Sequence, residues 1–536
     1  MDNSRAVYGI DLGTTYSCIA QVDRFDQAVV LRNFEGDSTT PSAVYFDADD
    51  PDKVVVGKEA KGMLAVEPEN TVVFVKRDMG NDIAFDKANN HFPHHYDPTE
   101  ISAFILRKLV QDANALGDSP VPINDVVITC PAYFGTKERM QTKQAGLSAG
   151  LNVLAIINEP TAAAISYGVR LDKRQTVLVY DLGGGTFDVT YITVDHGAIR
   201  VVATGGDPHL GGVDWDTALA KYMLTAFNAE NGTYYNIDSD PILHNSLLLE
   251  AEMKKKNLTA RDEVKWNFSY NGRNLRMTVS RSDFEEITES LLDLTIEKTY
   301  EVLDNAKQKG FGKPDVVLLV GGSTLMPQVK TRVERELGCD AKFHDPAESV
   351  AKGAAIFAMN EAYAKAVQDY EDGEIDDKPK PITGDRTTVR NVTSKTYGHL
   401  VNVKQDDGTY RLMTENLIFA NTQLPTSYTT NGSLINDNQD YLPIDIYESD
   451  YTNSKTDELV ESDTCRDIDH QRLQLTKNYP KGEPVKTVFD INDEGILAVS
   501  VSVGVDRLDF RLHITGVKSE QELLLSKSLI MSKTIE

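Results

Sequence analysis

Two glycine-rich segments of the chain each place an aspartate directly after a short apolar stretch. The first reads DLGTT from Asp11, and the second reads DLGGGTFD from Asp181. Glycine lets a backbone turn tightly and approach an anion, and the amide N–H groups and hydroxyls that follow can donate hydrogen bonds to it. A carboxylate beside a phosphate is repelled unless a cation lies between them, so we interpret Asp11 and Asp181 as Mg²⁺ ligands acting through water. The two segments therefore predict a duplicated site for Mg²⁺ and a phosphate.

A third glycine turn, Gly321-Gly322-Ser323, also follows an apolar stretch, at residues 316–320. Turns of this kind often connect a strand to a helix without binding a ligand, so a single one is weak evidence. Three of them together favour a nucleotide cleft at the carboxyl ends of strands. The sequence has no GxxxxGK[ST] segment, so the loops are not of the Walker type.

The elements that must position these turns follow from the hydrophobic pattern. Over residues 1–366 short apolar runs alternate with helical patterns, which predicts an α/β fold with buried sheets. Residues 367–388 are acidic and contain Pro and Gly without periodicity, which predicts an interdomain linker. Residues 389–516 contain short alternating runs separated by Asp-Gly and Asn-Gly turns, which predicts an all-β sandwich. Residues 517–536 predict one short helix or tail.

Composition narrows the classes of partner. The chain has 536 residues, with 55 Lys and Arg against 82 Asp and Glu, so its formal net charge is −27. Such a protein repels nucleic-acid phosphates and anionic membrane surfaces, so we expect neither as a partner. The 4 cysteines are scattered and form no CxxC pair, which favours reduced thiols in a cytoplasmic protein over a zinc site or a disulfide framework. The sequence shows no apolar leader at residues 1–5, and its apolar runs are far shorter than the ~20 residues that span a bilayer.

With these residues in place, the chain resembles the seventy-kilodalton heat-shock chaperone family (DnaK-like), itself part of the actin and sugar-kinase ATPase superfamily. The match covers essentially all of residues 5–366 and continues more weakly into the β domain. The matching segments are GIDLGTTYSCIA at 9–20, VKRDMG at 75–80, ITCPAYF at 128–134, INEPTAAAISYG at 157–168, VYDLGGGTFDV at 179–189, HLGGVDWD at 209–216, LLVGGSTLMP at 318–327, LIFANTQLPTSYTT at 417–430 and VFDINDEGILAVSVSV at 488–503.

The resemblance implies a duplicated, two-lobed actin-like ATPase domain over residues 1–366. Its first lobe would comprise about residues 1–172 and 345–366, and its second lobe about residues 173–344. A sandwich at residues 389–516 would hold extended peptides. The implied cofactors are ATP or ADP and Mg²⁺, with K⁺ as a further candidate ion. The implied partners are unfolded polypeptide segments, a J-domain co-chaperone and a nucleotide exchange factor.

The resemblance implies functional roles for individual residues, which are assigned here to the matching positions of this sequence. Lys76 would be the catalytic lysine, since a point charge suits a phosphoryl group in transfer. Glu159, Asp181 and Asp188 would order Mg²⁺ and the attacking water, with the Thr186 hydroxyl near the γ-phosphate. The nucleotide-binding positions would be Gly13, Thr14, Thr15, Tyr16, Gly183, Gly184, Gly185, Glu252, Lys255, Gly321, Gly322 and Ser323.

Three pairs of residues carry over from the family, and two of them keep an alternative interpretation. Glu252 and Lys255 lie three positions apart, so they share a helix face, and they would either grip the ribose or form a plain surface ion pair. Pro131 and Arg139 match the family's switch, which reports the nucleotide state to the second domain. In the β domain, Ile435 and Leu442 align with the apolar lining of a peptide pocket or with the core of the sandwich.

The sequence also departs from the family. Leu325 stands where the family has an Arg that stacks on adenine, and Ala347 stands where it has an Asp, so base affinity should be reduced. The linker offers only Ile382 where the family has a run of leucines, and residues 404–408 lengthen a hairpin. After the sandwich, residues 517–536 are expected to supply only a stub of the family's helical lid.

Three functions follow in order of preference. The first is an ATP-dependent chaperone that hydrolyses ATP and binds extended apolar segments of unfolded proteins. The second is a nucleotide-binding chaperone partner with weak or absent ATPase cycling, which the altered linker and Leu325 motivate. The third, a small-molecule kinase on the same scaffold, is disfavoured because such a kinase needs neither a linker nor a sandwich.

Overall fold

The computed structural model describes residues 6–536 except 82, 86–94, 118–121, 169–173, 196–197, 380–387, 406–408, 450–455, 459–464 and 512–516. The centre of the expected linker, with Ile382, and part of the lengthened hairpin at 404–408 therefore lie outside the described residues. Within the described part of the chain, no helix is both long and apolar enough to cross a membrane.

Two sheets with the same strand arrangement form the first part of the molecule. In the first sheet, β1 is antiparallel to β2 and parallel to β8, and the order is β3-β2-β1-β8-β9 with β4 pairing β2. In the second sheet, β10 is antiparallel to β11 and parallel to β15, and the order is β16-β15-β10-β11-β12-β17. The repeated DLG segments are thus part of a repeated fold, and we call the elements built on these sheets the first and second lobes. The strands are β1 (Val7–Asp11), β2 (Tyr16–Val22), β3 (Ala28–Leu31), β4 (Thr40–Pro41), β8 (Asp125–Cys130), β9 (Asn152–Asn158), β10 (Gln175–Leu182), β11 (Phe187–Asp195), β12 (Ala198–Asp207), β15 (Val316–Val320), β16 (Ala341–Phe343) and β17 (Thr388–Arg390).

Helices α4 (Glu159–Gly168) and α10 (Ser349–Glu371) pack against each other between the two sheets. Their alanines and glycines allow this close approach. A Cβ at Gly353 would lie 1.7 Å from the backbone oxygen of Ala162, and one at Gly9 would lie 2.1 Å from the backbone nitrogen of Ala355. Helix α10 runs past residue 366, where the sequence analysis placed the start of the linker.

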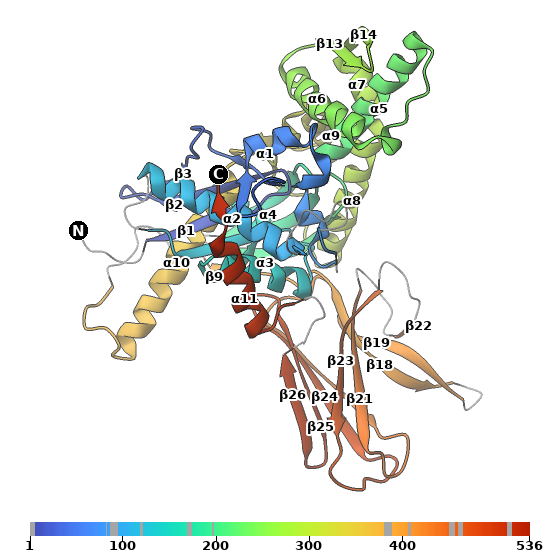
Figure 1. Ribbon diagram of the computed structural model, residues 1–536. Coiled ribbons are helices and arrows are strands. Elements are labelled where there is room, and N and C mark those ends of the chain that lie inside the picture. The colour runs from blue at the N-terminus through green and yellow to red at the C-terminus, as the bar shows by residue number, and fades with distance from the viewer. Residues whose placement is uncertain are drawn as a thin grey trace.

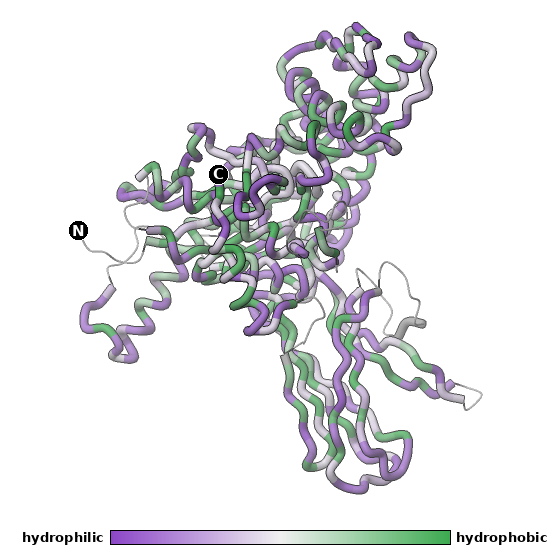
Figure 2. Tube along the Cα trace, viewed as in Figure 1, coloured by the Kyte–Doolittle hydropathy of each residue, from purple (hydrophilic) through white to green (hydrophobic). Residues whose placement is uncertain are grey.

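Smaller units extend each lobe (Figure 1). The first lobe carries a sheet of order β27-β6-β5-β7, and the second carries the hairpin β13–β14 packed with α5 and α6. Apolar segments run through the middle of both lobes, while hydrophilic segments predominate at their periphery (Figure 2). The remaining elements of the lobes are β5 (Ala43–Phe46), β6 (Lys53–Val56), β7 (Thr71–Val73), β13 (Glu263–Tyr270), β14 (Arg273–Ser280), β27 (Thr534–Ile535), α1 (Lys58–Met63), α2 (Pro98–Leu116), α3 (Thr136–Ser148), α5 (Gly212–Asn231), α6 (Pro241–Ala260), α7 (Arg281–Ile287), α8 (Glu289–Gln308), α9 (Pro327–Leu337) and α11 (Glu520–Ser532).

The β domain consists of two antiparallel sheets, of order β22-β19-β18-β21-β23 and β20-β24-β25-β26. Inward-facing residues of both sheets form one apolar core around Phe489. Leu442 is partly buried and packs against this core, whereas Ile435 is exposed. The strands are β18 (Thr396–Lys404), β19 (Tyr410–Ile418), β20 (Thr426–Ser433), β21 (Tyr441–Ser449), β22 (Thr456–Glu458), β23 (Cys465–Gln474), β24 (Pro484–Ile491), β25 (Leu497–Val503) and β26 (Asp506–Arg511).

The β domain is joined to both lobes by direct contacts. Strand β17 begins at Thr388, the last residue assigned to the linker from sequence, and pairs in parallel with β12 of the second lobe. Helix α3 of the first lobe contacts the β domain through polar groups, including Thr136 Oγ1 to the backbone oxygen of Gly495 at 3.3 Å, and through Met140, which packs against the sandwich core. Beyond β26 the chain returns to the first lobe as α11 and β27 (Figure 1).

Candidate nucleotide site

The carboxyl ends of β1, β10 and β15 open into a cavity of about 470 Å³ between the two lobes. Almost all of the residues expected to bind nucleotide or to act in catalysis line it. Gly185 and Asp188 are the exceptions and are not among the lining residues. The lining residues expected from sequence are Asp11, Gly13, Thr14, Thr15, Tyr16, Lys76, Glu159, Asp181, Gly183, Gly184, Thr186, Glu252, Lys255, Gly321, Gly322 and Ser323.

The two DLG loops pack directly against each other across the cavity. A Cβ at Gly184 would lie 1.9 Å from Thr15 Oγ1, and one at Gly185 would lie 2.3 Å from Thr14 Cγ2. No larger residue fits at either position, so these glycines are required by close approach rather than by an unusual turn. The contact brings the donor-rich backbones of both loops to one place, as an anion site requires.

A buried lysine lies among four carboxyl groups at the floor of the cavity. Lys76 Nζ donates to Glu159, and both side chains are almost fully buried. Asp11 Oδ1 accepts from Thr129 Oγ1 at 3.0 Å, and Asp188 Oδ1 accepts from the backbone N–H of Ala132 at 2.9 Å. Together with Asp181, these residues place four carboxyl groups around the single ammonium group of Lys76.

Burial dominates the titration of these groups. It raises the pKa of Glu159 to about 7 and that of Asp188 to about 8, and it raises the pKa of Asp11 and of Asp181. Burial of Lys76 would lower its pKa, but the Glu159 and Asp11 carboxylates outweigh burial and the pKa is raised. The floor of the cavity therefore favours added positive charge.

A divalent cation fits this donor set. Hard carboxylate oxygens suit Mg²⁺, and the excess of buried carboxyl groups over Lys76 gives it a negative environment. Among the described residues no three His, Cys, Asp or Glu side chains form a ready-made metal cluster. Asp11 and Asp181 would therefore hold the ion through water, together with oxygens of the nucleotide.

Lys76 and its neighbour Arg77 are positioned by a short 3-10 helix, Val75–Asp78, which follows Phe74 in the left-handed region (φ 59°). The sequence analysis did not assign a role to Arg77. Its Nε donates to the backbone oxygen of Gly185 at 2.7 Å, and its Nη2 pairs with Asp214 at 2.9 Å. The feature of the sequence that could have indicated a role for Arg77 is its position directly after Lys76 in the VKRDMG segment.

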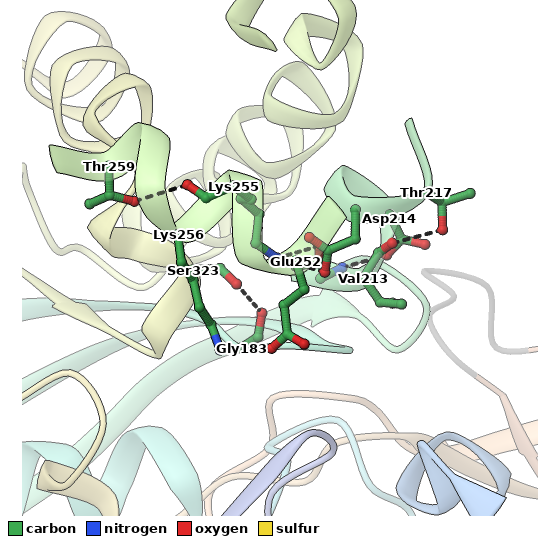
Figure 3. A network of polar contacts seen from close by, with 12 residues as sticks. Gly183, Val213, Asp214, Thr217, Glu252, Lys255, Lys256, Thr259 and Ser323 are labelled. Atoms are coloured by element: carbon green, nitrogen blue, oxygen red, sulfur yellow. Dashed lines mark hydrogen bonds and ion pairs between the residues drawn. The ribbon is translucent and has the colours of Figure 1, made fainter. Parts of the chain in front are cut away.

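Helix α6 presents Glu252 and Lys255 to the cavity (Figure 3). Asp240 caps its N-terminus by accepting from the backbone N–H groups of Ile242 and Leu243, and Pro241 occupies the first turn. The two residues share the helix but do not pair with each other. Lys255 Nζ instead donates to Asp216 Oδ2 and to the backbone oxygen of Gly212, each at 2.8 Å.

Glu252 belongs to a cluster that joins the two lobes across the mouth of the cavity. From the first lobe, Lys61 Nζ pairs with Glu252 at 2.5 Å and the Tyr16 hydroxyl donates to it at 3.1 Å. Lys256, one turn along α6, pairs with Glu252 at 2.8 Å and donates to Tyr16 at 2.9 Å. Burial would raise the pKa of Glu252, but Lys61 and Lys256 outweigh it and hold the pKa at about 2. Lys61 and Lys256 were not predicted from sequence.

The remaining wall of the cavity is mostly apolar. Leu325 lines it and is 45% exposed, so its side chain offers a hydrophobic surface without the charge of an arginine. Ala347 lies on the same wall. The other lining residues of this region are Leu248, Leu249, Thr259, Met326, Pro346 and Val350.

Pro131 and Arg139 lie between the cavity and the β domain. The turn at Pro131 presents the Ala132 N–H to Asp188, and it continues to Phe134, whose backbone oxygen accepts from Arg139 Nε at 3.0 Å. A Cβ at Gly495 would lie 3.5 Å from the same Nε, so Arg139 reaches the β domain. Further contacts that were not predicted from sequence join the first lobe to the β domain. Ser394 Oγ donates to the backbone oxygen of Phe134, just before α3, and two ion pairs reach α3 itself, Lys143–Glu494 and Arg466–Glu138.

Comparison with known proteins agrees with this geometry. The family model described as Hsp70 protein matches residues 7–371. Two curated relatives, each a Chaperone protein DnaK from a strain of Halobacterium salinarum, are 35% identical to the chain over 507 residues. Each alignment covers 92% of this chain and 73% of the relative. The chain therefore belongs to the Hsp70 family of ATP-dependent molecular chaperones.

Proposed function

We propose that this chain hydrolyses Mg²⁺-bound ATP in the cavity between its lobes and binds extended apolar segments of unfolded proteins in its β domain. The observation that carries the proposal is the floor of the cavity, where two interlocked glycine loops face a buried lysine among carboxyl groups. This combination supplies both anion donors and a preference for a cation. A duplicated actin-like ATPase fold is part of the same proposal, and the repeated strand arrangement supports it.

Each group has a role in this reaction. The loops at Gly13–Tyr16 and Gly183–Thr186 hold the phosphates through backbone N–H groups and the Thr186 hydroxyl, and Mg²⁺, when bound, neutralises phosphate charge. Asp11 and Asp181 would hold the ion through water. Lys76 stabilises the charge that develops on the transferring phosphoryl group.

Glu159 and Asp188 would position the attacking water and accept its proton. The pKa of Glu159 is raised to about 7 and that of Asp188 to about 8, which is the range a general base needs near neutral pH. Lys76 contacts Glu159 directly, so the proton acceptor and the phosphoryl-stabilising charge are held in one geometry. At the other end of the cavity, Lys255 and Glu252 would hold the ribose, with Gly321, Gly322 and Ser323 near the base.

The β domain would receive the signal through Pro131, Arg139 and the contacts of α3. Leu442 packs at the edge of the sandwich core and is the better of the two candidate peptide contacts, since Ile435 lies exposed outside it. Unfolded polypeptide, a J-domain co-chaperone and a nucleotide exchange factor are the proposed partners, K⁺ is a candidate second ion, and a cytoplasmic location belongs to the same proposal.

Single-turnover hydrolysis of Mg²⁺-ATP tests the proposal. We expect the Lys76→Ala variant to lose at least about a hundredfold in rate, because the charge lies within the reacting site. Lys298→Ala is the matched control, since Lys298 pairs with the exposed Glu301 on its own helix and is not among the residues that line the cavity. If the parent chain hydrolyses ATP no faster than Lys76→Ala, the ATPase proposal fails and the partner protein without cycling replaces it.

An unfolded apolar peptide added to the same assay tests the coupling. A change in hydrolysis rate that Leu442→Asp abolishes would support peptide binding in the β domain. No response to any peptide in a chain that hydrolyses ATP would show that coupling is absent and would favour the partner protein. A sugar that accelerates ATP consumption and becomes phosphorylated would instead identify a kinase.

A further inference from the structure

Each of the three glycine carbonyls in the loop Gly183–Thr186 accepts a hydrogen bond. The carbonyl oxygen of Gly183 accepts from the backbone N–H of Gly212 at 3.0 Å. That of Gly184 accepts from the backbone N–H of Val213 at 2.8 Å. Both donors lie in the first turn of α5 (Figure 3), where helix N–H groups have no acceptor within the helix. The second lobe therefore fixes these two carbonyls by itself.

The third carbonyl is held by the first lobe. Arg77 Nε donates to the backbone oxygen of Gly185 at 2.7 Å, and Arg77 Nη2 pairs with Asp214 on α5 at 2.9 Å. Asp214 Oδ2 also accepts from the backbone N–H of Gly211 at 2.7 Å, so the partner of Arg77 is itself fixed at the start of the helix. The guanidinium thus bridges the loop and α5 with two separate N–H groups.

A held carbonyl fixes the direction of the next N–H group. In a trans peptide unit the C=O and the N–H point in opposite directions, and among the described residues only the Leu424–Pro425 peptide is cis. The carbonyl of Gly185 points back to Arg77, so the N–H of Thr186 points the opposite way. Thr186 lines the cavity, whereas Arg77 and Gly185 are not among its lining residues. Arg77 therefore holds, from outside the cavity, a peptide unit whose N–H is directed into it.

This peptide unit needs an anchor because glycine does not restrain it. Gly185 has no Cβ, so rotation about its backbone bonds, which turns the unit over, meets little steric resistance. Close packing excludes a larger residue, since a Cβ at Gly185 would lie 2.3 Å from Thr14 Cγ2 and 3.1 Å from Arg77 Nε. The position has to be glycine, and the orientation of the following N–H has to come from a hydrogen bond.

One short element of the first lobe sets both this donor and the buried cation. Arg77 directly follows Lys76 in the 3-10 helix Val75–Asp78. Lys76 lines the cavity and pairs with Glu159, while Arg77 holds the loop. Preorganised donors and cations of this kind stabilise the negative charge that develops on a transferring phosphoryl group. Movement of the 3-10 helix would displace both groups together.

We propose that Arg77 is a positioning residue that directs the N–H of Thr186 toward the terminal phosphate of bound ATP, and that it does so only while the two lobes are closed. The inference rests on the proposed function, in which the Thr186 hydroxyl lies near that phosphate. When the lobes part, the carbonyls of Gly183 and Gly184 keep their donors from α5, but the carbonyl of Gly185 loses Arg77. Opening then disables the loop for phosphoryl transfer while the rest of it still holds a nucleotide.

Replacement of Arg77 by lysine separates orientation from attraction between the lobes. Lysine keeps the positive charge, but its single ammonium group cannot reproduce the fork that reaches both Gly185 and Asp214. Removal of a whole oxyanion donor costs about 10²–10³ in rate, so we expect Arg77→Lys, which misdirects one, to slow single-turnover hydrolysis of Mg²⁺-ATP at least about tenfold. The Kd of Mg²⁺-ADP, which lacks the terminal phosphate, should change less than about threefold.

The matched control for this variant is Arg107→Lys. Arg107 likewise donates to backbone oxygens, at the end of α11, but it is not among the residues that line the cavity. We expect no change in rate for the control. An unchanged rate in Arg77→Lys would overturn the proposal, and so would an ADP affinity that falls as much as the rate, since that would place the effect in closure alone.

Amide hydrogen exchange tests the direction of the N–H without any hydrolysis. Inorganic phosphate added with Mg²⁺-ADP stands in for the terminal phosphate, so the Thr186 amide of the parent should be protected. In Arg77→Lys this amide should exchange about tenfold faster, while the amides of Gly13–Tyr16 keep their protection. Equal protection of Thr186 in both proteins, or no protection of it in the parent, would refute the role of Arg77.

A failure of the proposed function would be seen separately. A parent chain that binds Mg²⁺-ADP but hydrolyses ATP no faster than Lys76→Ala lacks the ATPase activity, and the exchange measurement still decides the role of Arg77. Asp214→Asn is a second variant, because it weakens the partner that orients the guanidinium. It should slow hydrolysis about threefold, and added to Arg77→Lys it should have a smaller effect than alone. Full additivity would show that the two residues act independently and would overturn the proposal.

Discussion

The cluster across the mouth of the cavity should control how fast nucleotide leaves. Separation of the lobes breaks the contacts of Lys61 and Tyr16 in the first lobe with Glu252 in the second, so these contacts oppose any opening of the cavity that releases nucleotide. The perturbation is Lys61→Met, which keeps a side chain of similar length and removes the charge. No phosphate, ribose or metal contact is assigned to Lys61, so its loss acts on closure.

The magnitude follows from the titration of Glu252. Its pKa is held at about 2 against an ordinary value of 4.5, a shift worth about 3 kcal/mol. The side chains of Lys61 and Glu252 are only 18% and 14% exposed, so screening by solvent is modest. Lys256 lies on the same helix as Glu252 and stays with it when the lobes part. Assigning roughly half of the shift to the contact across the cavity gives about 1.5 kcal/mol, or about a tenfold faster release of nucleotide.

The assay is displacement of a fluorescent ADP analogue by excess ATP in a stopped-flow instrument. Lys61→Met should raise the dissociation rate about tenfold, and Glu252→Gln combined with Lys61→Met should add less than the two single effects together. Lys298→Met, in an exposed pair with Glu301, is the control. An unchanged rate in Lys61→Met, or strict additivity in the double variant, would refute the reasoning.

Low pH should accelerate nucleotide release, as Lys61→Met does. The pKa of Glu252 is lower in the folded protein than in the unfolded chain, so its contribution is complete above about pH 4.5 and is lost as the pH falls toward 2. Nucleotide release from the parent should therefore accelerate as the pH is lowered below about 4.5, and release from Glu252→Gln should change less. Equal acceleration in both proteins would exclude Glu252 as the titrating group.

Three further outcomes can be checked. Leu325→Arg should tighten ADP binding about fivefold by calorimetry, because a guanidinium can stack on the base where leucine cannot; no gain would place the base elsewhere. Gly9→Ala should lower the free energy of unfolding by about 3 kcal/mol, because its Cβ would lie 2.1 Å from a backbone atom of α10. Gly62→Ala is the control, because a Cβ there would meet open space. Equal melting temperatures of the two variants would contradict this. Burial raises the pKa of the Cys130 thiol to about 11. A thiol reagent should therefore modify the partly exposed Cys339 before Cys130, and Cys130 only on unfolding. Labelling of Cys130 in the folded protein would contradict its burial.

The floor of the site could be predicted from sequence because its requirements are local. The Asp11 and Asp181 segments combine a strand end, glycines and donors within a few residues, and the structure gives both the same strand neighbours. Lys76 and Glu159 lie far from these segments in the sequence, and they were placed only through the family resemblance. Spacing along one helix identified Glu252 and Lys255 as neighbours but not their partners, because partners from other elements leave no periodic signal.

Contacts between domains were the least predictable features. The boundary between linker and sandwich was placed after Thr388, yet Thr388, Val389 and Arg390 form one short strand that pairs with β12 of the second lobe through backbone groups that any sequence offers. The C-terminal helix was expected from its leucines, but its buried residues are Ser526 and Ile530, while Leu524 and Leu525 face outward. Which face of a short helix is buried depends on the surface it meets, and that surface lies in another domain.

Helix α3 has an unusual composition for its position. Most of its residues are buried, yet those buried residues are largely polar, among them Thr136, Glu138, Gln141 and Gln144. Thr136 and Glu138 contact the β domain through polar groups, and Met140 packs against the sandwich core. If the β domain leaves, water can replace the polar partners, and the apolar surface that α3 newly exposes is a single Met140 side chain rather than a large patch. The first lobe can therefore pass through an undocked state without becoming prone to aggregation, so a protein that manages the exposed apolar segments of other chains does not add one of its own.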